Sequence, residues 1–412
     1  MEIKKILIIG GGFGGVRTAL DLDKRKIPNA SIALVSDRPH FEYHPALYRV
    51  VTGRSPLEVC IPLRDVFEGK EVAVAQDRIV GIDLAGKTVE GFSGTYYKYD
   101  FLVLALGSET EYFDIPGLPE LSFGFKSINE ALRLKRHLQE LFEGMAKEDH
   151  GDKVKSASFI VIGGGASGVE LAGDLAVYAA KLAENHKIDP SLVTIDLVER
   201  APRLLPSMPK ELSATVTLKL RSLGVNIFVN RAVVKEEVEA VHLKDMEMKT
   251  KTVIWTAGVK PHHLYSKNNG MPLDENGRVA VDDHLQIKGH PGVFVIGDAA
   301  ATKYSGMAQT AIRDGGYVAE FIASKILKKN IAPYKPVKPL YAFPVGPGWA
   351  AILIRKIKIY GRLGWWMRRF VDLNFFSTIL PFKKALLAFQ NRKTLCESCM
   401  ICSLEGGENR NV

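Results

Sequence analysis

Short apolar runs that end in glycine-rich turns recur along the chain and predict alternating strands and helices. Residues 6–9 are apolar, residues 10–15 read G-G-G-F-G-G, and residues 16–24 have the spacing of an amphipathic helix. A second β-rich run follows at residues 31–35. Strand, turn, helix and strand in this order are typical of a βαβ unit, in which a helix connects two parallel strands.

The same order returns in the middle of the chain. Strand, glycine turn, helix and returning strand are predicted at residues 158–162, 163–168, 169–183 and 193–198. Two further buried runs, residues 99–106 and 252–256, are typical of strands that cross from one such domain to the other. We therefore predict an α/β fold with two Rossmann-like dinucleotide-binding domains, the second inserted in the first.

The predicted domain boundaries follow from these crossing strands. Residues 1–115 and 259–335 form one dinucleotide-binding domain, and residues 116–258 form the inserted one. A C-terminal region, residues 336–395, and a flexible cysteine-containing tail, residues 396–412, complete the chain.

Charge changes this picture only in the C-terminal region. The net charge is +9, and of the 55 basic and 46 acidic residues, residues 351–393 hold ten basic ones and a single acid, Asp372. The rest of the chain is therefore balanced. Bulky apolar side chains are interleaved with this charge: Trp365, Trp366, Phe370, Phe375, Phe376, Phe382, Leu386, Leu387 and Phe389. Such a mixture is typical of interfacial helices at an anionic membrane surface.

This composition leads to several expectations about partners. We expect peripheral attachment to a membrane surface on its cytoplasmic side, a homodimer, and no nucleic acid. Dimer contact is the alternative use of the aromatic surface, and both uses are compatible. No apolar run reaches the ~18 residues that a spanning helix needs, and no targeting segment precedes the first strand.

The first glycine motif has the spacing that holds a pyrophosphate. Gly10 allows the tight turn, Gly12 lets the pyrophosphate approach the backbone, and Gly15 lets the helix pack close to the strand. The helix N-terminus then faces the phosphates. Ser36 stands where many such folds have a carboxylate for the ribose, and Asp37 follows it. Asp37 is either a ribose ligand or a solvated turn residue.

The second motif is Gly163, Gly165 and Gly168, and Glu199 closes its returning strand. A carboxylate at that position accepts a hydrogen bond from a ribose 2′-OH and repels a 2′-phosphate, which favours NADH over NADPH. Arg200 beside it could soften this preference.

Two acidic residues are further candidates. Glu170 lies in the first turn of the second motif's helix. It either acts near a nicotinamide or is simply a carboxylate favourably placed against the helix dipole. Gly297 and Asp298 follow another buried strand, and an aspartate there can bind the ribityl chain of a flavin.

With these pieces placed, the chain resembles the type II NADH:quinone oxidoreductases of the two-dinucleotide-domain flavoprotein superfamily. The resemblance extends over about residues 3–390. It is carried by I-I-G-G-G-F-G-G (8–15), L-A-L-G-S-E-T-E-Y-F-D-I-P-G (104–117), V-I-G-G-G-A-S-G-V-E-L-A-G (161–173), I-W-T-A-G-V-K (254–260), V-F-V-I-G-D (293–298) and M-A-Q-T-A (307–311).

The resemblance implies noncovalently bound FAD in the first domain and NADH in the inserted one. It places Ala308 and Gln309 beside the flavin, Gln309 at the border of a quinone pocket, and Glu170 near the nicotinamide, so Glu170 and Gln309 are the expected catalytic residues. The expected FAD-binding residues are Gly10, Gly12, Gly14, Gly15, Asp37, Arg38, Gly107, Asp298, Ala308 and Gln309. The expected NADH-binding residues are Gly163, Gly165, Gly168, Glu170, Glu199 and Gly258.

The implied reaction is hydride transfer from NADH to FAD and transfer of two electrons to a membrane quinone, without proton pumping. A sulfide:quinone reductase or a disulfide reductase would need a cysteine pair near the flavin, and only Cys60 precedes residue 396. A ferredoxin-type reductase and a slow NAD(P)H sensor stay open. Cys396, Cys399 and Cys402 have a spacing that could bind zinc or an iron–sulfur cluster. A reduced mobile tail is the simpler interpretation, and we expect no metal site.

Overall fold

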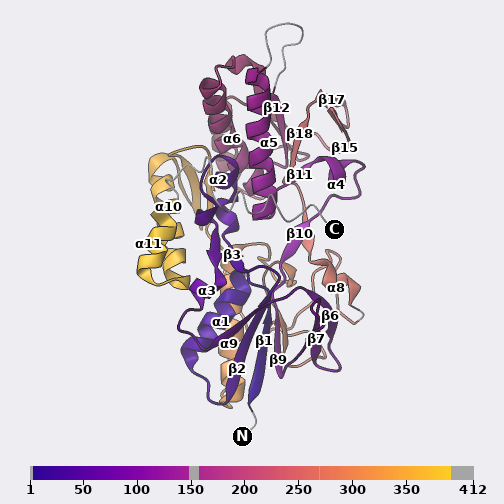
Figure 1. The fold of residues 1–412 in the computed structure, drawn as a ribbon, viewed down its shortest axis with the longest axis vertical. Helices are drawn as coiled ribbons and strands as arrows, with labels where there is room; N and C mark the ends of the chain where they lie inside the picture. Colours follow the sequence, from indigo (N-terminus) through magenta and orange to yellow (C-terminus); the bar gives the residue numbers. More distant parts are fainter. Residues whose placement is uncertain (1–2, 148–156, 269, 391–412) are drawn as a thin grey trace.

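The computed structural model describes residues 3–147, 157–268 and 270–390. Its first parallel sheet has the strand order β20-β9-β1-β2-β5. These strands are β1 (Lys4–Ile9), β2 (Ala30–Ser36), β5 (Val72–Gln76), β9 (Phe101–Leu104) and β20 (Val293–Val295). The helices α1 (Phe13–Arg25) and α9 (Ala308–Ile326) pack against each other beside this sheet (Figure 1). Because β1 lies between two other strands, its residues 6–9 are fully buried, as their apolar run predicted.

A second parallel sheet has the order β11-β18-β12-β13-β14. It consists of β11 (Phe123–Gly124), β12 (Ala157–Ile162), β13 (Val193–Val198), β14 (Val225–Phe228) and β18 (Thr252–Trp255). The helices of this half are α5 (Ile128–Lys147), α6 (Ala166–Asn185) and α7 (Lys210–Ser222). The predicted α/β fold with parallel sheets is thus confirmed.

The chain leaves the first half after β9 and returns to it after β18. The two crossings run side by side as an antiparallel pair, β10 (Ser108–Thr110) with β19 (Val259–Pro261). In Figure 1 this pair lies between the upper half with α5 and α6 and the lower half with β1 and α1. All strands of the second sheet therefore lie, in chain order, between β9 and β20 of the first.

Short antiparallel elements complete both halves. Three-stranded sheets are formed by β6 (Ile79–Asp83), β7 (Thr88–Gly91) and β8 (Tyr96–Lys98), by β15 (Val233–Glu237), β16 (Ala240–Leu243) and β17 (Met246–Lys249), and by β21 (Tyr341–Pro344), β22 (Ala350–Ile354) and β23 (Ile357–Ile359). The strands β3 (His40–Glu42) and β4 (Cys60–Pro62) pair with each other. Short helices are α2 (Leu47–Val51), α3 (Leu63–Val66), α4 (Leu118–Leu121) and α8 (His263–Lys267).

Two helices occupy the aromatic and basic C-terminal segment, α10 (Gly361–Ile379) and α11 (Phe382–Gln390). They pack against each other, and α10 also packs on β22. Arg368, one of the ten basic residues of this segment, is buried and paired with Asp372. None of the helices in the described part of the chain combines the length and apolar character that spanning a bilayer requires.

Candidate functional site

One cavity of about 1350 Å³ is lined by residues of both glycine turns. Residues 10–14 come from the first turn and residues 165–167 from the second, while residues 306–309 precede and begin α9. Asn374 and Phe375 of α10 form part of the same lining. Pockets for one small ligand usually measure ~300–1,000 Å³, so this cavity has room for more than one.

The two glycine turns have the same backbone geometry. Gly10 has φ +112° and Gly163 has φ +111°, values that favour glycine. A Cβ on Gly15 would lie 1.9 Å from the carbonyl oxygen of Gly10, and one on Gly168 would lie 1.8 Å from that of Gly163. Close packing of helix on strand therefore requires a glycine at the end of each motif.

The middle glycine of each motif faces open space. No atom lies within 4 Å of a Cβ built on Gly12 or on Gly165, and both residues line the cavity. Each is the N-cap of its helix, and within the described residues no side chain caps either one. Backbone N–H groups at two helix N-termini are thus available to phosphate oxygens. The residues present fit two dinucleotides.

The residues at the end of β2 and just after it differ in their surroundings, although Ser36, Asp37 and Arg38 all line the cavity. Ser36 is buried, and its Oγ accepts a hydrogen bond from the backbone N–H of Arg38 at 3.2 Å. The Asp37 side chain is 59% exposed and lies 3.8 Å from the Arg38 guanidinium. Ser36 thus stabilises the turn, and Asp37 is the accessible carboxylate.

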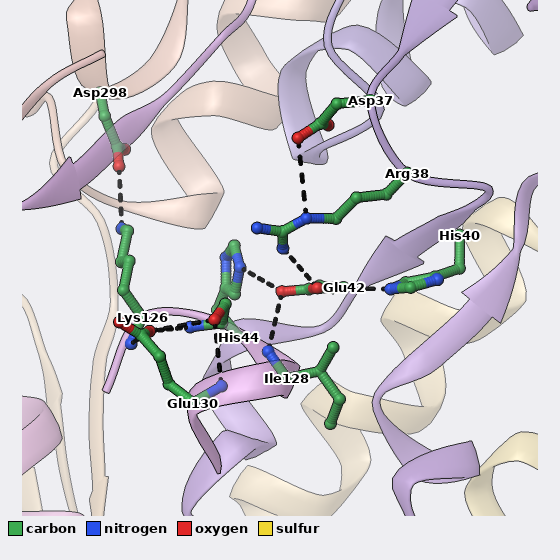
Figure 2. Close-up of polar contacts among 10 residues, drawn as sticks. Asp37, Arg38, His40, Glu42, His44, Lys126, Ile128, Glu130 and Asp298 are labelled. Carbon is green, nitrogen blue, oxygen red and sulfur yellow. Dashed lines mark hydrogen bonds and ion pairs between the residues drawn. The ribbon is translucent and has the colours of Figure 1, made fainter. Parts of the chain in front are cut away.

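Glu42 is the centre of a polar cluster that sequence reasoning missed (Figure 2). Its buried carboxylate accepts hydrogen bonds from His40 and His44, both at 3.3 Å, and pairs with Arg38. It also accepts the backbone N–H of Ile128 at the start of α5. Burial opposes ionisation, but the histidine bonds and Arg38 hold the pKa of Glu42 well below its usual range. An ionised carboxylate therefore fixes this cavity wall to the second half of the chain.

Asp298 also lies on the cavity wall. It accepts a hydrogen bond from Ser108 Oγ at 2.5 Å, and Lys126 Nζ lies 3.4 Å away, as Figure 2 shows for the lysine. Burial works against its ionisation, but Lys126 and Ser108 hold the pKa of Asp298 below its ordinary value. The cavity thus contains a carboxylate where the sequence predicted a ribityl ligand.

A second carboxylate binds the backbone of the turn that carries Gly297 and Asp298. Asp314 of α9 is fully buried, and it accepts hydrogen bonds from the backbone N–H of Gly297 at 3.0 Å and from the Tyr334 hydroxyl at 2.5 Å. Burial raises the pKa of Asp314 to about 6 despite these bonds. Asp314 fixes the position of Gly297 and hence of the aspartate that follows it.

Ala308 and Gln309 line the cavity, and the amide of Gln309 has a defined structural role. Gln309 Nε2 donates to the carbonyl of Leu340 at 2.8 Å, and Oε1 accepts the N–H of Leu340 at 3.1 Å. Gln309 therefore holds the segment before β21 against the start of α9.

Glu170 lines the cavity and is partly buried. Burial raises its pKa to about 8, although Arg368 and Arg49 favour the ionised form. Asp174, one helical turn further along α6, disfavours it. The carboxyl is accordingly neutral at pH 7, which suits a group that donates or receives a proton.

A buried ionic cluster attaches α10 to the body behind Glu170. Asp372 pairs with Arg368 and with Arg49, the latter at 3.1 Å, and accepts the Tyr43 hydroxyl at 2.6 Å. Arg49 also pairs with Glu58. Because Arg368 lines the cavity as well, α10 is part of the site rather than an appendage.

Two of the predicted NADH-binding residues, Glu199 and Gly258, are held by contacts with the protein itself. Glu199 is buried, and its two carboxylate oxygens accept the N–H groups of Gly164 and Ala201, both at 2.7 Å. A Cβ on Gly258 would lie 2.6 Å from the Phe113 ring, so glycine is needed there for packing. Neither Glu199 nor Gly258 belongs to the cavity lining, whereas Gly107 does. Cofactor contact by Glu199 and Gly258 stays a prediction.

No cysteine among the described residues lines the cavity. Cys60 in β4 is half-buried. The predicted tail with Cys396, Cys399 and Cys402 lies outside the described residues.

Comparison with known proteins shows which family the chain matches. The family described as pyridine nucleotide-disulphide oxidoreductase matches residues 4–315. The chain is 34% identical over 350 residues to a type II NADH:quinone oxidoreductase of Mycobacterium tuberculosis, covering 81% of this chain and 75% of the relative. It is 30% identical over 333 residues to the type II NADH:quinone oxidoreductase of Staphylococcus haemolyticus, covering 77% and 82%.

Solved structures show the same fold. NDH2 from Plasmodium falciparum in complex with NADH matches with a TM-score of 0.85 at 18% identity, covering 94% of this chain and 97% of that one. The sulfide:quinone oxidoreductase of Aquifex aeolicus matches with a TM-score of 0.78 at 20% identity, covering 96% and 98%.

Proposed function

Since the chain belongs to the type II NADH:quinone oxidoreductases of the pyridine nucleotide-disulphide oxidoreductase family, we propose that it transfers a hydride from NADH to FAD and two electrons onward to a membrane quinone. The observation that carries this proposal is the single cavity lined by both glycine turns. When bound, FAD supplies the redox chemistry by accepting the hydride and passing its electrons on.

The two halves divide the cofactors between them. Residues 1–115 and 259–335 hold FAD through Gly12, Asp37 and Asp298, and residues 116–258 hold NADH through Gly165. The fit rests on the open space at both middle glycines and on the two uncapped helix N-termini. Glu199 shapes the NADH turn by binding its backbone, and it selects against a 2′-phosphate through its charge.

Proton handling belongs to Glu170. A quinone takes up two protons with its two electrons, and Glu170 is a neutral carboxyl on the cavity wall. Gln309 positions the wall through Leu340 at the quinone end of the cavity. No helix in the described part of the chain could provide a path through a bilayer, and we propose a reaction that is not coupled to proton pumping.

The outer surface of α10 and α11 is the proposed contact with lipid. Exposed apolar side chains gather there beside the exposed Arg362 and Lys383: Leu363, Trp366, Phe370, Phe382 and Leu387. Rings at the headgroup level with adjacent basic groups suit peripheral binding, here to the cytoplasmic face of the membrane. A homodimer would present two such surfaces.

The test is a two-step assay on purified, FAD-loaded protein. NADH should bleach the flavin absorbance rapidly, and a short-chain quinone should restore it rapidly. Bleaching without recovery would instead favour a sensor or a protein acceptor such as ferredoxin. NADPH, sulfide and several quinones complete the comparison.

Replacing Gln309 with leucine tests the quinone end of the cavity. The variant loses both hydrogen bonds to Leu340, so we expect a KM for quinone about tenfold higher, with little change in the rate of flavin reduction by NADH. Gln309→Glu keeps an acceptor for the N–H of Leu340 and should be less affected. An unchanged quinone KM in both variants would remove Gln309 from the quinone site.

A further inference from the structure

Three metal-ligating side chains come together where the chain crosses between its halves. Glu109 belongs to β10, which leaves the first half, while His262 and His263 follow β19, which returns to it. One ligand atom from each residue lies within 4.8 Å of the others. In the described part of the chain this is the one group of three such residues with that proximity.

The contacts within this group are few and weak enough to exchange. His263 Nδ1 lies 3.0 Å from Glu109 Oε2, and the two imidazole rings are stacked with centroids 4.3 Å apart. His262 Nδ1 accepts a long, weak hydrogen bond from the N–H of Leu264 at 3.3 Å. Little is therefore lost if these nitrogens and the carboxylate turn toward an ion.

The electrostatic surroundings also suit a cation. His262 is half-buried, and the neutral form of an imidazole is the one that binds a metal ion. Asp37 and Glu109 add negative charge near this ring. Lys260, the cross-strand neighbour of Glu109 in the β10–β19 pair, is itself paired with Glu111 at 3.4 Å.

We propose that Glu109, His262 and His263 form a binding site for a divalent first-row ion of the zinc type. Two imidazoles and one carboxylate are a common donor set for Zn²⁺, and a water completes the tetrahedron. Bond lengths of ~2.0–2.2 Å require the three side chains to close on the ion. The ion ties β10 to α8 and so restrains both crossings of the chain at one point.

This site is separate from the proposed electron transfer. It uses none of the glycine-turn, Glu170 or Gln309 groups, although its residues border the same cavity. A protein that binds no zinc can therefore still oxidise NADH, and a protein that binds zinc can lack NADH oxidation.

Calorimetric titration of the full-length, FAD-loaded protein with Zn²⁺ alone tests the proposal. Since Cys396, Cys399 and Cys402 are a competing ligand set in the sequence, all three are first changed to serine. We expect one Zn²⁺ per chain and a rise in Tm when the ion is added. Glu109→Gln and His263→Ala should each weaken binding by about tenfold or more and remove that rise.

A matched control is His242→Gln. His242 lies in β16 with the Glu237 carboxylate 3.2 Å away, and among the described residues no second histidine joins this pair as a ligand. This substitution should leave zinc affinity unchanged. The FAD content of every variant reports folding, and the isosteric Glu109→Gln keeps the test valid if His263→Ala folds poorly. Absence of binding in the serine background, or binding that survives both Glu109→Gln and His263→Ala, would overturn the site.

Discussion

The turn at residues 10–15 and the turn at residues 163–168 can be compared position by position. The first glycines have φ values within one degree of each other. The last glycine of each motif packs against the carbonyl of the first glycine of that motif, and the middle glycines face open space. The backbone that holds a pyrophosphate is therefore the same in both halves, and what distinguishes them is carried by side chains.

The first difference is at the end of the returning strand. Ser36 bonds one backbone N–H at 3.2 Å, whereas Glu199 bonds two at 2.7 Å. The ionised residue makes the shorter and stronger bonds. The second turn is consequently held by a buried carboxylate, whereas the carboxylate beside the first turn, Asp37, is exposed.

The second difference lies two residues after the last glycine. Arg17 in α1 pairs with Asp21 one turn later at 2.8 Å, and opposite charges satisfy each other. The matching positions of α6 hold two acids, Glu170 and Asp174. Burial raises the pKa of Glu170, and Asp174 adds to that rise. Only the second half thus places a carboxyl that is neutral at pH 7 in the cavity.

The largest expected effects come from filling the open space of each turn. Gly12 has φ −86° and Gly165 φ −75°, both extended, so valine fits either backbone. We expect Gly12→Val to be purified without FAD, and Gly165→Val to retain FAD while its KM for NADH rises about a hundredfold. Absorbance and steady-state kinetics measure both. Stoichiometric FAD in Gly12→Val would break the proposed division of cofactors.

An intermediate effect is expected from making the second turn resemble the first. Glu199→Ser removes the acceptors of Gly164 and Ala201, so we expect the NADH KM to rise about tenfold, from the loss of charged hydrogen bonds. The preference for NADH over NADPH should fall with it. Ser36→Ala, the matched control in the first half, should leave both values nearly unchanged. If the preference is unaltered, Glu199 only anchors the turn.

The smallest effect is a change in pH dependence. Glu170 is neutral below its pKa of about 8 and ionised above it, so wild-type quinone reduction should slow as pH rises through 8. Glu170→Gln should run a few-fold slower and lose this step. Its folded state should also gain stability relative to wild type at pH 9. The raised pKa of Glu170 lowers the stability of the wild-type protein progressively as pH rises from about 4.5 to 8, and the full loss persists above pH 8.

Glu236→Gln is the control for this comparison. Burial raises the pKa of Glu236 to about 8 as well, but it lies in β15 and is not part of the cavity lining. Its replacement should alter the pH dependence of Tm and leave the pH profile of the rate alone. A wild-type rate profile without a step near pH 8 would contradict the role of Glu170.

Local patterns were sufficient to predict the framework. The strand predicted at residues 193–198 is β13, and both glycine turns are where their spacing placed them, because each feature depends on residues close together in sequence. The crossing strand predicted at residues 99–106 is shorter, Phe101–Leu104, since the chain turns at Gly107 with φ +70°.

The polar walls of the cavity could not be predicted in this way. Glu42 has two histidines and an arginine within four residues, a visible signal, but its burial depends on Ile128, which is 86 positions away. Arg368 and Asp372 have the spacing of an ordinary surface pair, and Arg49, the second partner of Asp372, lies over 300 positions earlier. The burial and pairing of these charged side chains depend on partners far away in the sequence, and the periodicity of hydrophobic residues does not reveal such partners.

The buried pairing of Asp372 with Arg49 has a consequence for shortened forms of the protein. A chain ending before α10 would lose Asp372, one of the two acids paired with Arg49, and would open the cavity beside Phe375. Removing one partner of a buried pair costs ~3–5 kcal/mol. Proteolysis or truncation upstream of Gly361 would thus yield an inactive remnant, not a water-soluble version of the enzyme.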